Sequence, residues 1–219
     1  MPTPVSDSTL EQFRAAVAGT RPVPAGVTAA AVSVSFALGL LAKALTVSGR
    51  RQTLPRHLSD LEALATAARA GSTRMMQLAG EDIGAFEDYL ASARRPHDDT
   101  LARETRHRAL ERAVHRAIEL PLAAARESAA GLELCVEACP LTHVAVIADL
   151  GACASLLASG LRIFLLCAES NVRQLAADPS AYREVLARGK DRQEQGLLRA
   201  QAVFTHVAAT LDAAPAPQA

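Results

Sequence analysis

The sequence has few aromatic residues and no excess of either charge. Phe, Tyr and Trp make up 3% of its 219 residues, with no Trp, whereas β-strands are enriched in aromatic and β-branched side chains. The 23 basic and 23 acidic residues give a formal net charge of zero. Nucleic-acid binding depends on clustered Lys and Arg, so we expect no nucleic-acid partner. A β-rich fold is equally disfavoured.

The sequence also lacks a secretory signal and a convincing metal site. Its first ten residues contain neither a basic segment nor an apolar one, which predicts a cytoplasmic location. Cys135 and Cys139 are spaced for one helix face, but no second pair of Cys or His complements them, so we expect no metal. The four cysteines lie in or beside apolar runs, where free thiols behave as small hydrophobic groups.

Helical periodicity runs through most of the chain. Ala and Leu dominate the composition, and both favour helices. We therefore expect an all-α bundle of about six helices, forming a single domain over residues 1–219 with a frayed tail from about residue 212. Pro121 falls inside one predicted helix and should kink it. The expected helices run from a cap at Ser6 or Asp7 to near Gly19, then over residues 27–47, 57–93, 101–139, 141–175 and 181–211.

Residues 27–47 are almost entirely apolar or small, with Lys43 as the only charge. Their length permits a membrane span, but interspersed Ser and Thr lower the hydrophobicity, and we interpret the stretch as a buried central helix without membrane contact. A helix that is apolar on every side needs many neighbours. We therefore expect a homo-oligomer interface.

Residues 141–175 form a second apolar stretch, and Asp149 lies within it. A carboxylate in such surroundings is either an acid near a helix N-terminus, stabilised by the helix dipole and solvated, or a functional group. The residue pattern leaves both interpretations open.

Three groups of residues, in order along the chain, carry a resemblance to a known family. Residues 22–30 read PVPAGVTAA, residues 82–86 read DIGAF, and IELPL at 118–122 is followed by ADLG at 148–151 and by Asn171 and Val172. These are similar to the P-x-P-G-G-G-S-x-A-A turn, the D-x-x-A-F segment, and the V-P-L, S-D and asparagine elements of the cyclodeaminase/cyclohydrolase family. That family comprises the cyclodeaminase domain of formiminotransferase-cyclodeaminase and bacterial methenyltetrahydrofolate cyclohydrolases. The likeness covers about residues 8–177.

The resemblance implies a helical homodimer with a folate cleft near the subunit interface and a tetrahydrofolate derivative as substrate, without a separate cofactor. Family members close 5-formimino-tetrahydrofolate with loss of ammonia or open the 5,10-methenyl form with water. Both reactions pass through a tetrahedral carbon between N5 and N10 and need proton transfer, a task that suits carboxylates. The resemblance makes Asp82 and Asp149 the catalytic candidates, converging on one hollow. The implied substrate-binding residues are Pro24, Ala25, Gly26, Val27, Thr28, Lys43, Phe86, Cys167 and Asn171.

Lys43, Arg50 and Arg51 could meet a glutamate tail, although a solvated helix end explains them equally well.

This chain departs from the family pattern at the turn and near the asparagines. Ala25 and Val27 replace two glycines, and the β-branched Val27 would fill space left for a ligand. Cys167 stands where the family has its first asparagine, and Ala148 replaces the serine beside the acid. Three hypotheses follow: a folate cyclohydrolase or cyclodeaminase, the same scaffold repurposed for ring formation or opening on a non-folate substrate, or a non-catalytic helical dimer. The last predicts that Asp82 and Asp149 lie apart.

Overall fold

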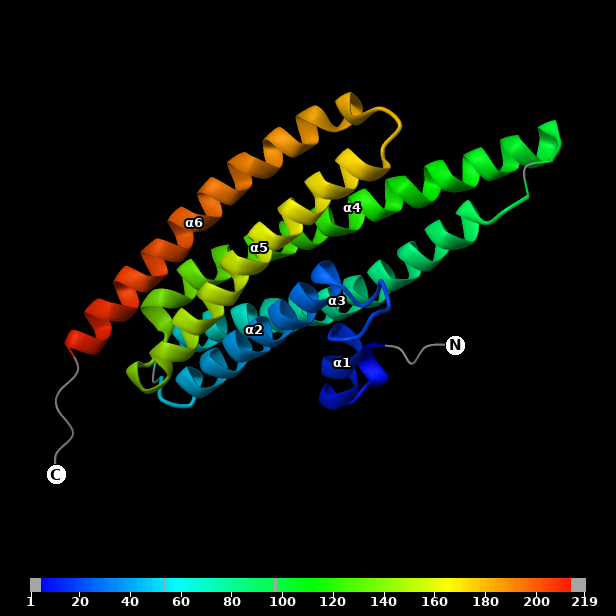
Figure 1. Cartoon of the computed structure of the whole chain (residues 1–219). Helices are drawn as coiled ribbons and strands as arrows, with labels where there is room; N and C mark the ends of the chain where they lie inside the picture. Colours follow the sequence, from blue (N-terminus) through cyan, green and yellow to red (C-terminus); the bar gives the residue numbers. More distant parts are fainter. Residues whose placement is uncertain (1–4, 53, 97, 214–219) are drawn as a thin grey trace.

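The computed structural model describes residues 5–213 except 53 and 97, and within these residues the regular structure is entirely helical. Short 3-10 turns, η1 to η4, connect or precede the helices. The prediction of an all-α bundle with about six helices is confirmed (Figure 1). The tail was predicted to fray from about residue 212; α6 ends at Asp212, and residues 214–219 fall outside the described residues. The helices are α1 (Leu10–Val17), α2 (Gly26–Gly49), α3 (Pro55–Ala93), α4 (Thr100–Ala138), α5 (Ile147–Leu175) and α6 (Arg183–Asp212).

Local sequence explains most of the helix starts. Thr9 begins α1 with a capping box, because its hydroxyl accepts from the Gln12 N–H while the Gln12 side chain accepts from the Thr9 N–H. The predicted cap at Ser6 or Asp7 is therefore wrong, and Val5–Asp7 form η1 instead. Asp99 caps α4, and Pro55 occupies the first turn of α3, where its missing N–H costs nothing. Two 3-10 turns delay α5 to Ile147.

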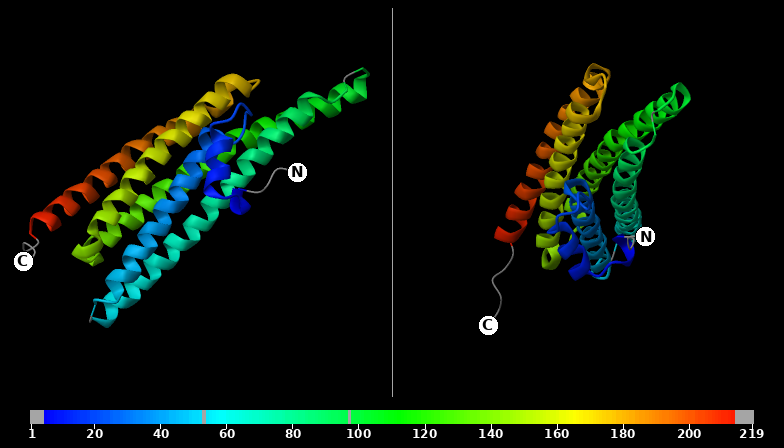
Figure 2. Two further views of the ribbon diagram at one scale, coloured as in Figure 1. Left: turned by 60° about the horizontal axis from the view of Figure 1, so that its bottom comes forward. Right: turned by 45° about the vertical axis from the view of Figure 1, so that its right-hand side comes forward.

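The central helix α2 runs antiparallel to both α3 and α5. Near its N-terminus Thr28 contacts Asp82 of α3, and near its C-terminus the Ser48 hydroxyl accepts from the His143 N–H just before α5. The long helices lie side by side, while the α3–α4 hairpin extends beyond the rest (Figures 1 and 2). Close approach of α2 and α5 requires Gly160, because a methyl group there would lie 2.3 Å from Val34 Cγ2.

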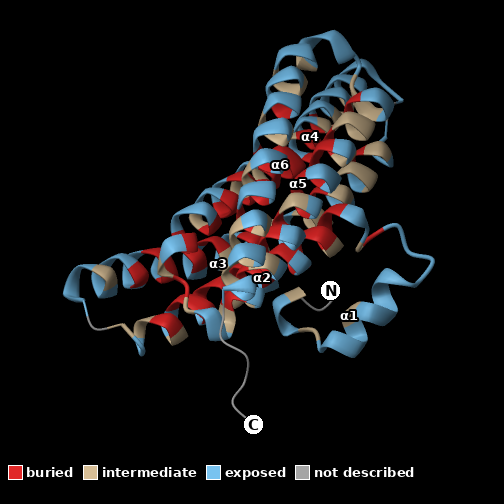
Figure 3. Ribbon diagram, turned by 90° about the vertical axis from the view of Figure 1, so that its left-hand side faces the viewer, coloured by how far each residue is buried: buried red, intermediate tan, exposed pale blue. Residues whose placement is uncertain are grey.

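The core is centred on α2, which confirms the predicted buried central helix. Ala31, Val34, Ala37, Leu41 and Leu45 are each 0% exposed. Buried residues follow the facing sides of α2 to α5, whereas α1 has none (Figure 3). The helix is thus surrounded largely within one chain.

Two stretches, Gly26–Gly49 and Val144–Leu175, are long and apolar enough to cross a membrane by length and composition alone. The most apolar window of the first is 61% buried inside the protein, as a core helix would be, and that of the second is 39% buried. The outer face of α5 consequently exposes Leu156, Ile163 and Leu166, with Phe36 of α2 also exposed.

Candidate active site

The central helix begins without a side-chain cap of its own. Its N-cap residue is Ala25, which makes no side-chain capping bond. The first N–H groups of an α-helix have no acceptor within the helix. The start of α2 therefore needs an acceptor from another element.

Asp82 of α3 provides that acceptor. The Thr28 hydroxyl donates to Asp82 Oδ2 at 2.7 Å, and the Thr28 backbone also hydrogen-bonds to the carboxyl group. Burial raises the pKa of Asp82 above the ordinary carboxyl value, while the two hydrogen bonds from Thr28 act to lower it. Asp82 thus retains a proton at higher pH than an exposed Asp and still accepts hydrogen bonds at a helix start. This combination suits a group that must both donate and accept protons.

Cys167 of α5 lies beside this carboxyl group. Burial raises the pKa of the Cys167 thiol, and the negative charge of Asp82 raises it further, which keeps the thiol protonated at neutral pH. A methyl group added at Gly26 would lie 3.5 Å from Cys167 Sγ, an ordinary contact distance. Gly26, Thr28, Asp82 and Cys167 therefore meet where α2, α3 and α5 come together.

Asn171, one turn beyond Cys167, has a structural contact that its sequence position does not reveal. Pro121 lacks an N–H, so the carbonyl of Ala117, four residues earlier in α4, has no ordinary helical donor. Asn171 Nδ2 donates to this oxygen at 2.8 Å. The bond ties α5 to α4 at the proline, and it uses the amide group expected to bind substrate.

The expectation that Asp82 and Asp149 share one hollow is wrong. Asp149 lies in the first turn of α5, roughly 18 residues before Cys167, which corresponds to about 27 Å along the helix. That end of α5 is next to the C-terminus of α2, whereas Asp82 is at its N-terminus. Asp149 is half-buried, as the helix-dipole interpretation allows, and any catalytic role for it stays a prediction.

The other predicted substrate-binding residues do not all lie near Asp82. Val27 is 8% exposed and belongs to the core, and its φ angle is not positive. That its side chain fills space left for a ligand stays a prediction. Phe86 follows Asp82 by one helical turn and pairs with Tyr89 at 6.2 Å between ring centroids. Lys43 lies about 22 Å further along α2 than Thr28 and does not join this group. Ala25 is exposed.

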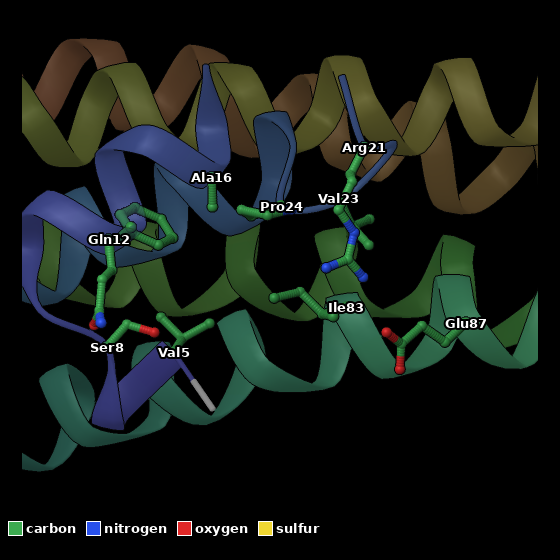
Figure 4. A pocket seen from close by; sticks show the side chains of 10 residues that line it. Val5, Ser8, Gln12, Ala16, Arg21, Val23, Pro24, Ile83 and Glu87 are labelled. Carbon is green, nitrogen blue, oxygen red and sulfur yellow. The ribbon is translucent and has the colours of Figure 1, made fainter. Parts of the chain in front are cut away.

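A cavity of about 380 Å³ lies next to the site, between the N-terminal segment and α3. Pro24 and Ile83, neighbours in sequence of the site residues, form part of its wall. Ser8 and Gln12 lie toward one side and Arg21 and Glu87 toward the other (Figure 4). Sequence reasoning missed these polar residues, because only the folding of α1 back toward α3 brings them together.

Among the described residues, no group of three or more His, Cys, Asp or Glu side chains is arranged to hold a metal ion. Cys135 and Cys153 place their sulfurs 3.6 Å apart in the core, and burial together with Cys135 raises the pKa of Cys139 to about 11. These three thiols are free and buried. They serve as packing groups between α4 and α5.

The fold and site define a class: an all-helical protein in which a half-buried carboxyl group from one helix caps the central helix of the bundle. A sequence model of the family described as Formiminotransferase-cyclodeaminase matches residues 9–191, and the chain belongs to this family.

A solved structure, that of formiminotetrahydrofolate cyclodeaminase from Thermotoga maritima, is similar in fold, with a TM-score of 0.76. The similarity covers 95% of this chain and 98% of the other at 15% sequence identity. Among curated proteins, none matches this chain.

Proposed function

We propose that this protein is an enzyme that acts on the one-carbon unit of a tetrahydrofolate derivative, as a methenyltetrahydrofolate cyclohydrolase or a formimino-tetrahydrofolate cyclodeaminase. The observation that carries the proposal is Asp82, a carboxyl group with a raised pKa, held by Thr28 at the start of α2. Membership of the family supports the substrate class. We expect no separate cofactor, a cytoplasmic location and a homodimer.

The proposed chemistry uses one carboxyl group in both protonation states. In the cyclohydrolase direction, the carboxylate takes a proton from water as the water oxygen bonds to the methenyl carbon. The resulting acid returns that proton to the ring nitrogen as the C–N bond breaks, and the hydroxyl group releases its remaining proton to solvent to give the formyl group. In the cyclodeaminase direction, the carboxylate takes the N10 proton as N10 bonds to the carbon of the protonated formimino group. The resulting acid gives that proton to the amino group, which leaves as ammonia as its C–N bond breaks. A raised pKa makes the acid form more accessible than at an exposed Asp, and the hydrogen bonds from Thr28 keep the carboxylate form available. Asp82 therefore carries the whole proton transfer in this scheme, without Asp149.

The test compares Asp82→Asn with Asp88→Asn, an exposed carboxyl group on the same helix. An amide oxygen at position 82 still accepts from Thr28, so capping of α2 survives while proton transfer is lost. We expect the wild type to consume 5,10-methenyltetrahydrofolate, or to form it from the 5-formimino compound, faster than buffer. Asp82→Asn should reduce kcat by about 10²–10⁴-fold, and Asp88→Asn should leave it unchanged. Unchanged kcat in Asp82→Asn would show that Asp82 is only a helix cap.

One observation favours a second candidate, a non-folate substrate on the same scaffold. Cys167 places a weakly hydrogen-bonding thiol beside Asp82, where the resembled family has an amide. If the wild type turns over neither folate, Cys167→Asn should restore measurable turnover under this second hypothesis. If neither the wild type nor Cys167→Asn turns over a folate substrate, the third hypothesis, a non-catalytic helical protein, is favoured. The separation of Asp82 and Asp149 also supports that hypothesis.

A further inference from the structure

A hollow of about 440 Å³ lies on the α3–α4 hairpin, which extends beyond the other helices (Figure 2). Small, buried residues form its base: Ser92 of α3 is 6% exposed, and Ala109 and Ala113 of α4 are each 5% exposed. Ser92 follows Asp82 by ten residues, which corresponds to about 15 Å along α3. The hollow is therefore separate from the candidate active site.

Guanidinium groups from both sides of the hairpin surround this hollow. Arg112 and Arg116 come from α4, and Arg95 comes from the segment just after α3. Asp88 is the one acidic residue among the described residues that line the hollow, so three arginines and one aspartate give the lining a formal charge of +2. Only Arg116 of the three has an ion pair among the described residues, with Glu81 at 3.5 Å. The excess positive charge favours an anionic ligand.

Arg112 occupies an unfavourable position on its own helix. The residues four before and four after it, Arg108 and Arg116, are also arginines, and like charges at this spacing destabilise a helix. Glu104 compensates Arg108 and Glu81 compensates Arg116, whereas Arg112 takes part in none of the ion pairs found among the described residues. An anion in the hollow would relieve this repulsion.

Ser92 adds a hydroxyl group at the base of the hollow. A helical serine can donate to the carbonyl four residues earlier, as Ser33 does, but the Ser92 hydroxyl makes no hydrogen bond to another described residue. Among the described residues, Ser128 has the only fully enclosed side-chain oxygen without a partner, so the Ser92 hydroxyl keeps access to the hollow. An unpartnered hydroxyl on a buried side chain is available to donate to a ligand.

The C-terminus of α3, next to the hollow, is shielded by a further arginine. Carbonyl groups at a helix C-terminus carry partial negative charge, which would repel an anion. Arg106 of α4 donates to the Ala93 carbonyl from Nε at 3.3 Å and from Nη2 at 3.2 Å. This contact places a positive charge on the last residue of α3 and offsets the repulsion.

Charge and geometry together favour a phosphate group over a carboxylate. A phosphate monoester carries about two negative charges at neutral pH, which match the formal charge of the lining. Its three terminal oxygens can accept from both walls and from the base at once, whereas the two oxygens of a carboxylate suit a single guanidinium fork. The hollow is also within the range of about 300–1,000 Å³ that is typical of small-molecule sites, so an organic group attached to the phosphate can fit.

We propose that this hollow binds a phosphate group, either inorganic phosphate or the phosphate of a small monoester. Arg95 and Arg112 donate to the phosphate oxygens from opposite walls, and the Ser92 hydroxyl donates from the base. The bound anion links α3 to α4 in the hairpin. The site does not depend on the proposed folate chemistry.

The test titrates the full-length protein by isothermal calorimetry at constant ionic strength. The probes are inorganic phosphate, glycerol 3-phosphate as a phosphate monoester, and succinate as a dicarboxylate of similar charge. The first variant is Arg112→Gln, and the second is Ser92→Ala, which leaves the net charge unchanged. The matched control is Arg94→Gln, which removes the same charge as Arg112→Gln from an exposed residue at the end of α3 that does not line the hollow.

We expect at least one phosphate probe to bind saturably with one site per chain, and succinate to bind at least about tenfold more weakly. Arg112→Gln should weaken phosphate binding about tenfold or more and Ser92→Ala about threefold to tenfold, because each removes a hydrogen bond to a charged group. Arg94→Gln should change the affinity less than about twofold, since salt screens exposed charges. Tighter binding of the monoester identifies a phosphorylated metabolite as the ligand, and tighter binding of inorganic phosphate identifies the free ion.

The proposal is overturned if neither phosphate probe binds the folded protein at millimolar concentration, or if succinate binds as tightly as the phosphate probes. It is also overturned if Arg94→Gln weakens binding as much as Arg112→Gln, because the loss would then reflect net charge alone, or if Ser92→Ala binds phosphate as the wild type does. Circular dichroism checks that each variant is folded. Arg95→Gln, in the segment after α3, repeats the comparison should Arg112→Gln not fold.

Discussion

The bond between Asn171 and Ala117 leads to a prediction that sequence alone would not suggest: the cost of removing Asn171 depends on Pro121. With Pro121 present, the Ala117 carbonyl receives its hydrogen bond from Asn171. With Pro121→Ala, the chain regains an N–H at position 121 that can donate to the same oxygen within the helix. The asparagine then becomes dispensable for this carbonyl.

The expected magnitude follows from the cost of an unsatisfied buried acceptor. Ala117 is 9% exposed, so Asn171→Ala leaves its carbonyl with little access to water, at a cost of about 1–3 kcal/mol. For a chain of this length, each kcal/mol corresponds to about 2–4 °C in Tm. In the Pro121→Ala background the same change should cost less than about 1 kcal/mol, which gives a coupling energy of about 1–2 kcal/mol.

The assay is urea unfolding of all four proteins of this double-mutant cycle, followed by circular dichroism at 222 nm. Any cavity left by Pro121→Ala is present in both proteins of that background and cancels in the difference. Gln174→Ala serves as a matched control, because Gln174 lies on the same helix and its amide makes a solvent-exposed hydrogen bond to the Ser170 side chain. If Asn171→Ala costs the same in both backgrounds, within about 0.5 kcal/mol, the proline and the asparagine are not coupled and this account of Asn171 is refuted.

Three further predictions concern charge, association and packing. The folded-state pKa of Asp82 is raised, so the folded protein binds more protons than the unfolded chain at pH values between the folded-state and unfolded-state pKa. The unfolding free energy of the wild type relative to that of Asp82→Asn should therefore fall as pH rises from about 4. Urea unfolding of both proteins across the pH range checks this, and an unfolding free-energy difference that rises with pH would contradict it. Leu166 of α5 is 65% exposed and should lie in a homodimer interface, so Leu166→Glu should give monomers in sedimentation velocity. The control Leu198→Glu, at a leucine of α6 that is 72% exposed, should leave the dimer intact. A monomeric wild type would contradict the prediction. Gly160→Ala should lower the unfolding free energy by about 1–3 kcal/mol, since its methyl group would overlap Val34. Gly80→Ala, which has open space around it, should raise the unfolding free energy by up to about 1 kcal/mol. Equal effects of the two substitutions in thermal unfolding would contradict this interpretation of the packing.

The helices could be predicted because their signals are local. The apolar run at 27–47 gives α2 almost its full length, and the predicted start at residue 101 lies one residue from the start of α4, which Asp99 caps. The start of α1 was misplaced because Ser6, Asp7 and Thr9 are all competent caps, and only Thr9 has Gln12 three residues later to complete a capping box. Among neighbouring residues that can each cap a helix, the one with a Gln or Glu three residues later to complete the capping box forms the cap.

The site could be predicted only in part, because it depends on the direction in which long helices pack. Asp82 and Thr28 were both identified as candidates, but their hydrogen bond follows from the antiparallel arrangement of α2 and α3. The same arrangement separates Asp149 from Asp82, since α5 is also antiparallel to α2 and begins at the opposite end. A motif shows which residues matter without showing which end of a bundle each one occupies.

The two roles of Asp82, helix cap and proton carrier, explain each other physically. A side chain at position 25 that capped α2 locally would compete with Asp82 for the Thr28 backbone N–H and leave the carboxyl group on α3 with only the bond from the Thr28 hydroxyl. Because Ala25 does not cap α2, the start of α2 binds the Asp82 carboxyl group of α3 and holds it beside Cys167. Burial at this point raises the pKa of Asp82. A serine at position 25 should therefore stabilise the helix start while loosening the Asp82 contact, so that a gain in Tm accompanies a pKa of Asp82 different from that in the wild type. If Ala25→Ser stabilises the protein and leaves the Asp82 carboxyl titration, followed by NMR, unchanged, then the missing cap has no part in positioning the acid.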